Sequence, residues 1–142
     1  RGFRSMAVRL HQHQANAMLI AEWLQSRPEV RQVLYPALPG APGHEIWKRD
    51  FHGASGLFAF ELQPFSEKAI EAMLDGMRLF GMGYSWGGYE SLLIPANVRK
   101  IRTAVPWRFK GPLLRIHIGL EDVEDLKDDL KHGLERLQYL HD

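Results

Sequence analysis

The chain has 142 residues, the size of one ordinary domain, and 45% of them are hydrophobic, which is enough for a globular core. Its 18 lysines and arginines and 17 aspartates and glutamates leave a net charge of only +1, which argues against a protein that binds nucleic acid through a basic surface. The absence of cysteine excludes disulfide frameworks, thiolate zinc sites and thiol nucleophiles, and no apolar run is long enough to span a membrane.

The first half of the chain is predicted to alternate helices and strands. Apolar residues recur at helical spacing over residues 5–25, and Pro28 ends this helix. Its inward stripe is predicted to contain Met6, Leu10, Ala17, Ile20, Ala21 and Leu24. Four further elements are predicted after it: a strand over residues 30–35, a short helix over 44–49, a strand over 57–62, and a helix over 66–76 with Ser66 as its N-cap.

Two strands and one helix are predicted in the second half. Residues 79–84 read as a strand that two glycines weaken, and residues 113–118 as a strand with Arg115 and His117 on one face. The last helix has the clearest pattern, a buried stripe of Val123, Leu126, Leu130, Leu134 and Leu137. The fold class that follows is α+β, a small and mostly antiparallel sheet of about four strands covered by helices.

Residues 84–91, Tyr-Ser-Trp-Gly-Gly-Tyr-Glu-Ser, form the most unusual stretch of the sequence. The paired glycines allow backbone amides to approach a ligand closely, and Ser85, Trp86 and Tyr89 offer a hydroxyl and aromatic walls. The alternative is a strand-to-loop turn whose aromatic rings pack on the core. No lysine follows the glycines at the position that a P-loop requires, which argues against that kind of phosphate site.

Arg115 is the second candidate for a functional residue, because it lies in an otherwise apolar strand, where an unpaired charge is costly. A guanidinium group can bind a carboxylate through two parallel hydrogen bonds, which suits an amino-acid substrate. The alternatives are an ordinary salt bridge, to Glu61 or Glu90, and an outward-facing residue on an edge strand.

The histidines and serines do not suggest a metal site or a hydrolase. His11 and His13 are two residues apart on a helix and point in different directions, and a cation beside His117 would be repelled by Arg115. We therefore expect no metal site, and we expect His117 to be a hydrogen-bonded structural residue. Neither Ser85 nor Ser91 lies in a Gly-x-Ser-x-Gly motif.

Five segments, in order along nearly the whole chain, resemble the cystathionine β-lyases, which belong to the Cys/Met-metabolism branch of the fold-type I pyridoxal-phosphate enzymes. The segments are residues 36–40, 43–51, 53–58, 84–92 and 114–122. Several long segments in the right order are more specific than one short motif. The form Ser-Trp-Gly-Gly-Tyr-Glu-Ser is similar to the β-lyases in particular, because the related γ-lyases and γ-synthases usually carry leucine where Trp86 stands.

The resemblance implies roles for three residues. Arg115 would bind the α-carboxylate of the substrate, and Ser85 and Trp86 would line the substrate pocket. The family also requires a lysine that forms a Schiff base with pyridoxal phosphate, in a Ser-x-x-Lys-like context. None of the six lysines has that context: Lys48, Lys68, Lys100, Lys110, Lys127 and Lys131. We therefore expect no catalytic and no cofactor-binding residue in this chain, and we do not expect it to hold pyridoxal phosphate alone.

The expected domain organisation is one domain over residues 1–142, the C-terminal part of a longer lyase whose large cofactor-binding domain is absent. The reaction implied for the full-length protein is α,β-elimination of L-cystathionine to homocysteine, pyruvate and ammonia, in methionine biosynthesis, and the chain alone is expected to be inactive. A cysteine-S-conjugate β-lyase and a stand-alone domain that binds small carboxylates are the alternatives, and a purely structural domain is a third. The resemblance also implies a cytoplasmic homotetramer built from dimers.

Overall fold

The structure is a computed structural model and describes residues 2–98, 101–106 and 108–138. A four-stranded antiparallel sheet lies at its centre, with strand order β1-β2-β4-β3. The strands are β1 (Val30–Leu34), β2 (Leu57–Leu62), β3 (Leu92–Pro95) and β4 (Leu113–His117). The helices are η1 (Gly2–Ser5), α1 (Met6–Gln25), α2 (His44–Asp50), α3 (Glu67–Asp75) and α4 (Val123–Gln138). The predicted α+β class is confirmed.

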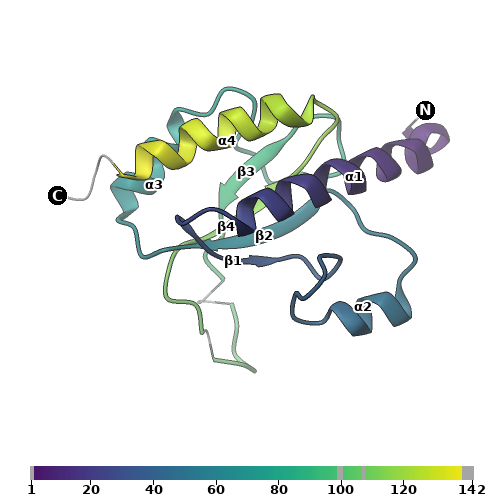
Figure 1. Ribbon diagram of the computed structural model, residues 1–142, viewed down its shortest axis with the longest axis horizontal. Coiled ribbons are helices and arrows are strands. Elements are labelled where there is room, and N and C mark those ends of the chain that lie inside the picture. Colours follow the sequence, from purple (N-terminus) through teal and green to yellow (C-terminus); the bar gives the residue numbers. More distant parts are fainter. Residues whose placement is uncertain (1, 99–100, 107, 139–142) are drawn as a thin grey trace.

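Helices α1, α3 and α4 lie along the sheet, whereas α2 lies apart from them beyond the end of β1 (Figure 1). The core side of the sheet carries Phe58 and Phe60 of β2 directly opposite Ile116 and Leu114 of β4. All four side chains are buried in one cluster with the apolar faces of the three helices. Burial of each such side chain contributes about 1.5–3 kcal/mol, so this cluster is the main source of stability.

Two helices follow the predicted patterns closely. In α4 the predicted residues Leu126, Leu130, Leu134 and Leu137 are all fully buried. In α3 the Ser66 hydroxyl accepts a hydrogen bond from the amide of Ala69 at 3.3 Å, as expected of an N-cap residue. None of the helices within the described ranges is long and apolar enough to cross a membrane.

The predicted inward stripe of the first helix is wrong for its N-terminal half. Met6 and Leu10 are exposed, because this half of α1 extends past the end of the sheet (Figure 1). The buried residues of α1 that precede Ala17 are instead polar, His13 and Asn16. From Ala17 onward the stripe is buried as predicted.

The predicted strand over residues 79–84 is also wrong. This segment makes a single isolated bridge, between Gly81 and Leu92, and β3 is formed by the residues that follow the loop. The physical reason is that two glycines provide no side chains to pack, and Met82 and Tyr84 remain exposed. Leu93 of β3, in contrast, is fully buried and pairs with Ile116.

Candidate functional site

Arg115 lies on β4, which is a central strand of the sheet, so the interpretation as an edge-strand residue is wrong. Its two neighbours across the sheet are Ala59 of β2 and Ile94 of β3. Neither neighbour offers a charge, and Arg115 makes no ion pair within the part of the chain that the structure describes. The guanidinium is therefore a half-buried cation set in an apolar row of side chains.

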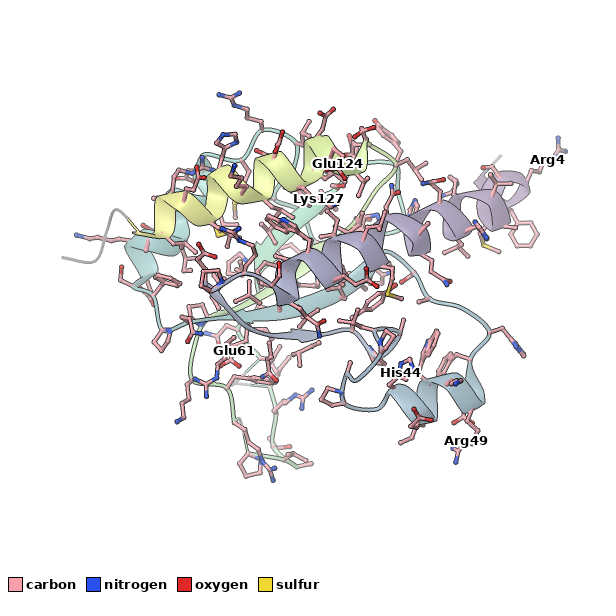
Figure 2. The ribbon with its side chains drawn as sticks, in the orientation of Figure 1. Arg4, His44, Arg49, Glu61, Glu124 and Lys127 are labelled. Carbon is pink, nitrogen blue, oxygen red and sulfur yellow. The ribbon has the colours of Figure 1, made fainter. Side chains whose placement is uncertain are left out.

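The predicted alternative partner Glu61 is used elsewhere. Its side chain lies toward the segment that leads into β4 (Figure 2) and accepts hydrogen bonds from the amides of Lys110 and Gly111 at 2.6 and 2.9 Å. Its second oxygen accepts from Gln32 at 2.7 Å and lies 3.7 Å from Arg31. This carboxylate therefore fixes the backbone before β4 and leaves Arg115 free of it.

The guanidinium of Arg115 is held by the loop of residues 84–91, hereafter the 84–91 loop, and by Gly83 just before it. Its Nη2 donates hydrogen bonds to the carbonyl oxygens of Tyr84 at 2.7 Å and Gly83 at 3.3 Å. The guanidinium carbon lies 5.6 Å from the ring centroid of Trp86 and 5.9 Å from that of Tyr84. Such distances allow cation–π attraction, which orients the cation without neutralising it.

The aromatic residues of the loop do not pack on the core, so that alternative interpretation is wrong. Tyr84 is 81% exposed, Tyr89 68% and Trp86 59%. Ser85 lies between Tyr84 and Trp86 in the sequence, is exposed, and makes no hydrogen bond with the described residues. The structure thus brings Arg115, Ser85 and Trp86 to one region, with exposed aromatic rings beside a cation that has no carboxylate partner among the residues the structure describes.

The far end of the loop is fixed by a buried polar network that the sequence did not reveal. The amide and hydroxyl of Ser91 donate to the two carboxylate oxygens of Glu121 at 2.7 and 2.8 Å. The same hydroxyl accepts from the amide of Gly119 at 2.8 Å. Because a Cβ on Gly119 would overlap the carbonyl oxygen of Tyr89, the loop can approach the chain after β4 only where glycine stands.

Two histidines are buried beneath the loop. The rings of His13 and His117 are tilted against each other with centroids 5.1 Å apart, and His13 is only 1% exposed. Burial lowers the pKa of both imidazoles. His117 and Arg9 lower the pKa of His13 further, while Glu121 opposes the shift. For His117 the hydrogen bond with the Gly88 backbone and the charge of Glu121 oppose the lowering of the pKa, and Arg115 adds to it. These causes favour two neutral rings.

No group of three or more histidine, aspartate or glutamate side chains in the described ranges is arranged to hold a metal ion. A groove of about 700 Å³ lies elsewhere, between α3 and the segments next to β3 and β4, and Phe65, Ile70 and Leu74 are among its lining residues. Arg115, Ser85 and Trp86 do not line this groove. The residues selected from the sequence therefore lie on an open surface and not in that groove.

None of the lysines described in the structure lies on β4, the strand that carries Arg115. Lys48 is on α2 and Lys68 on α3, whereas Lys127 and Lys131 are on α4. Lys127 is paired with Glu124 at 2.7 Å (Figure 2). Lys110 lies in the segment before β4, where its amide is bonded to Glu61. Lys100 lies outside the described residues. Of the lysines that the structure describes, none lies on β4 or in the 84–91 loop.

Comparisons with known proteins show the family of this chain. Residues 1–135 match the sequence model of the Cys/Met metabolism PLP-dependent enzymes. A cystathionine β-lyase of Salmonella typhimurium is 51% identical over 141 residues, which cover 96% of this chain and 36% of that protein. An L-alanine/L-glutamate racemase of Wolbachia pipientis is 43% identical over 99% of this chain and 36% of its own length.

Among solved structures, a cystathionine γ-synthase from Xanthomonas oryzae pv. oryzae in complex with cystathionine superposes with a TM-score of 0.83 at 37% identity. That alignment covers 98% of this chain and 37% of the other. The chain therefore spans little more than a third of the length of the relatives that it matches.

Proposed function

The chain belongs to the Cys/Met metabolism PLP-dependent enzymes, and from this premise we propose that it is the part of a carbon–sulfur lyase that binds the α-carboxylate of the substrate. The proposed reaction of the full-length protein is α,β-elimination of L-cystathionine, which with one water gives homocysteine, pyruvate and ammonia. The observation that carries the proposal is the Arg115 guanidinium, which has no carboxylate partner among the described residues and lies beside the rings of Tyr84 and Trp86.

Arg115 has the donors that this role needs. Nη2 donates to the carbonyl oxygens of Gly83 and Tyr84, whereas Nε and Nη1 make no hydrogen bond within the described residues. The N–H bonds of Nε and Nη1 do not point the same way, so a carboxylate that accepts from two nitrogens takes Nη2 together with Nε or Nη1 and displaces the longer, 3.3 Å bond to Gly83. A carboxylate that accepts from two guanidinium nitrogens is fixed in both position and plane, and charge assistance makes such bonds about twice as strong as neutral ones. In the proposed site, this geometry orients the Cα–H bond of the amino acid for proton removal.

The loop residues serve the rest of the substrate in this proposal. Trp86 and Tyr84 provide flat apolar surfaces that can cover the aliphatic part of an amino acid, and Ser85 offers a hydroxyl between them. When bound by the full-length protein, pyridoxal phosphate supplies the electron sink that makes removal of the Cα proton feasible. This chain contributes binding and orientation.

We further propose that residues 1–142 are one C-terminal domain and that the cofactor-binding groups, including the Schiff-base lysine, belong to the remainder of a longer polypeptide. The support is that the chain spans 36% of its lyase relative and that none of the described lysines lies on β4 or in the 84–91 loop. On this proposal the chain alone neither holds pyridoxal phosphate nor catalyses the elimination. The full-length protein would be a cytoplasmic homotetramer, which light-scattering mass and cell fractionation test.

The exposed rings of the loop favour one second candidate, a less selective cysteine-S-conjugate β-lyase. The surface beside Trp86 is open in this chain, so these residues alone do not restrict the size of the distal half of the substrate. The ratio of elimination rates for L-cystathionine and an aryl-cysteine conjugate distinguishes the two lyases. A stand-alone carboxylate-binding domain would instead bind amino acids tightly as the 142-residue chain without any cofactor.

The test of the reaction is product analysis with the full-length protein and L-cystathionine. Cleavage on the cysteine-derived side yields homocysteine and pyruvate, whereas cleavage on the other side of the sulfur yields cysteine and 2-oxobutyrate. Pyruvate and homocysteine in equal amounts support the proposal. Formation of 2-oxobutyrate, or racemisation of L-alanine without any release of keto acid, would overturn the proposed reaction while leaving the family unchanged.

A further inference from the structure

The peptide groups of Gly87 and Gly88 are held from two distant parts of the chain. Arg9 of α1 donates from Nη1 to the carbonyl oxygen of Gly87 at 2.7 Å. Nε2 of His117, on β4, lies 3.2 Å from the amide nitrogen of Gly87 and 3.2 Å from the carbonyl oxygen of Gly88. Gly87 has a φ of +81°, a conformation that other residues rarely adopt, so this turn has a defined shape that the contacts can hold.

The tautomer of His117 decides which contact Nε2 makes. Without a proton, Nε2 accepts a hydrogen bond from the Gly87 amide, and with a proton it donates to the Gly88 carbonyl. In the second tautomer Nδ1, which lies 3.5 Å from the Gly87 amide nitrogen, can accept from that amide. Because the two partners are adjacent peptide groups of one turn, the imidazole holds the turn in either neutral tautomer, provided that the ring itself stays in place.

The ring of His117 is kept in place by its surroundings. It is 2% exposed, and the ring of His13 packs against it from α1. Leu57 and Leu92 are its neighbours across the sheet on β2 and β3. The charged groups that act on this pair of imidazoles are Arg9 from α1, Arg115 from β4 and Glu121 from the segment after β4.

These contacts connect directly to the proposed substrate site. Trp86 immediately precedes Gly87, and His117 follows Arg115 by two residues on the same strand. We infer that Arg9 and His117 are positioning residues that fix the Gly87–Gly88 turn. The fixed turn sets the ring of Trp86 beside the guanidinium of Arg115, and this ring then determines which substrates the site prefers. This inference rests on the proposed function for its substrate, but the geometry of the turn does not depend on it.

The experiment uses the full-length protein with His117→Phe and Arg9→Met, each of which removes hydrogen bonds to the turn. His11→Phe and Arg4→Met are the matched controls, because both residues are exposed on the same end of the chain. His117→Gln is the conservative variant, since its amide can still donate or accept near the position of Nε2. Hydrogen exchange, measured without substrate, follows the peptide that contains residues 84–91.

In His117→Phe and Arg9→Met we expect exchange at this peptide to become about fivefold faster or more. We expect kcat/KM for L-cystathionine to fall by about 10- to 100-fold, and by clearly less for a smaller cysteine derivative that does not reach Trp86. His117→Gln should keep both the exchange rate of this peptide and kcat/KM for L-cystathionine close to the wild-type values, and the controls should match the wild type. Arg115→Ala, in contrast, should lose activity on both substrates alike.

Unchanged exchange in both variants overturns the inference, whether or not the wild type releases pyruvate. Faster exchange with unchanged substrate preference also overturns it, because the turn would then be held without affecting selection. If the wild type does not cleave L-cystathionine, the proposed function has failed, and the exchange result still decides whether the two residues hold the turn. Arg9→Met keeps the test valid even if His117→Phe fails to fold.

Discussion

Arg115 and His117 lie two residues apart on β4, and both contact the segment that contains Trp86. Arg115 binds the carbonyl oxygens of Gly83 and Tyr84, which precede Trp86. His117 contacts the peptide groups of Gly87 and Gly88, which follow it. Strand β4 therefore contacts the chain on both sides of Trp86. The cation proposed to bind the substrate and the turn next to Trp86 are therefore both held by contacts with β4, which is a central strand of the sheet.

The buried hydroxyl of Ser91 should be important for stability. In Ser91→Ala, the Gly119 amide and one oxygen of Glu121 lose their partner in a buried position, so we expect a loss of about 1–3 kcal/mol in the free energy of unfolding. Ser26→Ala is the control, because the hydroxyl of Ser26 is exposed, and it should change stability by less than about 0.5 kcal/mol. Urea unfolding followed by circular dichroism measures both. Equal effects of the two variants would contradict the role assigned to Ser91.

Stability should decrease in mild acid because of the two buried histidines. Burial lowers the pKa of His13 and His117 in the folded protein below the ordinary value of 6.5. As the pH falls below 6.5, these histidines therefore bind more protons in the unfolded chain than in the folded protein. The contribution of the neutral pair is therefore fully present above pH 6.5 and is lost as the pH falls through the lowered values. His13→Phe should flatten this dependence, whereas His132→Phe, at an exposed position, should leave it unchanged. The free energy of unfolding at a series of pH values gives the slopes, and an unaltered slope in His13→Phe would argue against this origin.

Glycine at position 119 should be required for the close approach of the 84–91 loop to the chain after β4. A Cβ at this position overlaps the Tyr89 carbonyl oxygen and lies within 2.8 Å of the Glu90 backbone, so Gly119→Ala must displace the loop. We expect a loss of about 1–3 kcal/mol in stability, as for other overpacked buried sites. Gly88→Ala is the matched comparison, because nothing lies within 4 Å of a Cβ there and its φ is not positive. Thermal unfolding that ranks Gly88→Ala as the more damaging variant would contradict the geometry.

Trp86 should influence which substrates are accepted more than how stable the protein is. Its ring is 59% exposed, so Trp86→Leu removes little buried surface, and we expect a change in stability of less than about 0.5 kcal/mol. Loss of the flat ring beside Arg115 should lower kcat/KM for L-cystathionine by about tenfold in the full-length protein. Phe3→Leu, at another exposed aromatic residue, is the control for both measurements. A Trp86→Leu enzyme with wild-type kcat/KM on all substrates would remove Trp86 from the site.

Much of the fold could be predicted because its periodic elements are long. The leucines of α4 repeat regularly enough to fix both the helix and its buried face, and Ser66 identifies the start of α3. The strand β3 was missed because four residues that end in proline give almost no alternating pattern, while the neighbouring run at residues 79–84 looked more like a strand. The exposed Met6 and Leu10 were misplaced because helical periodicity does not show where a helix leaves the sheet.

The candidate site was only partly predictable, for a similar reason. A cation in an apolar strand and a glycine-aromatic loop are local signals, so Arg115, Ser85 and Trp86 could be selected from the sequence. The contact between Arg9 and Gly87 joins positions 78 residues apart, and nothing local to Arg9 indicates it. Ser91 and Glu121 likewise meet only through the tertiary fold. Their roles depend on the folded arrangement and could be recognised only there.

The central claim is that Arg115 binds the carboxylate of the substrate, and the most direct test is kcat/KM for L-cystathionine in the full-length protein with Arg115→Ala, Arg115→Lys and the exposed control Arg78→Ala. Loss of a two-pronged charged contact should cost Arg115→Ala about 100-fold or more. Arg115→Lys should be intermediate, since it keeps the charge but not the planar fork, and added guanidinium ion should restore part of the activity of Arg115→Ala. An Arg115→Ala enzyme whose kcat/KM stays within about twofold of that of Arg78→Ala would contradict the account. Such a small loss is far below that expected when a charged pair is lost.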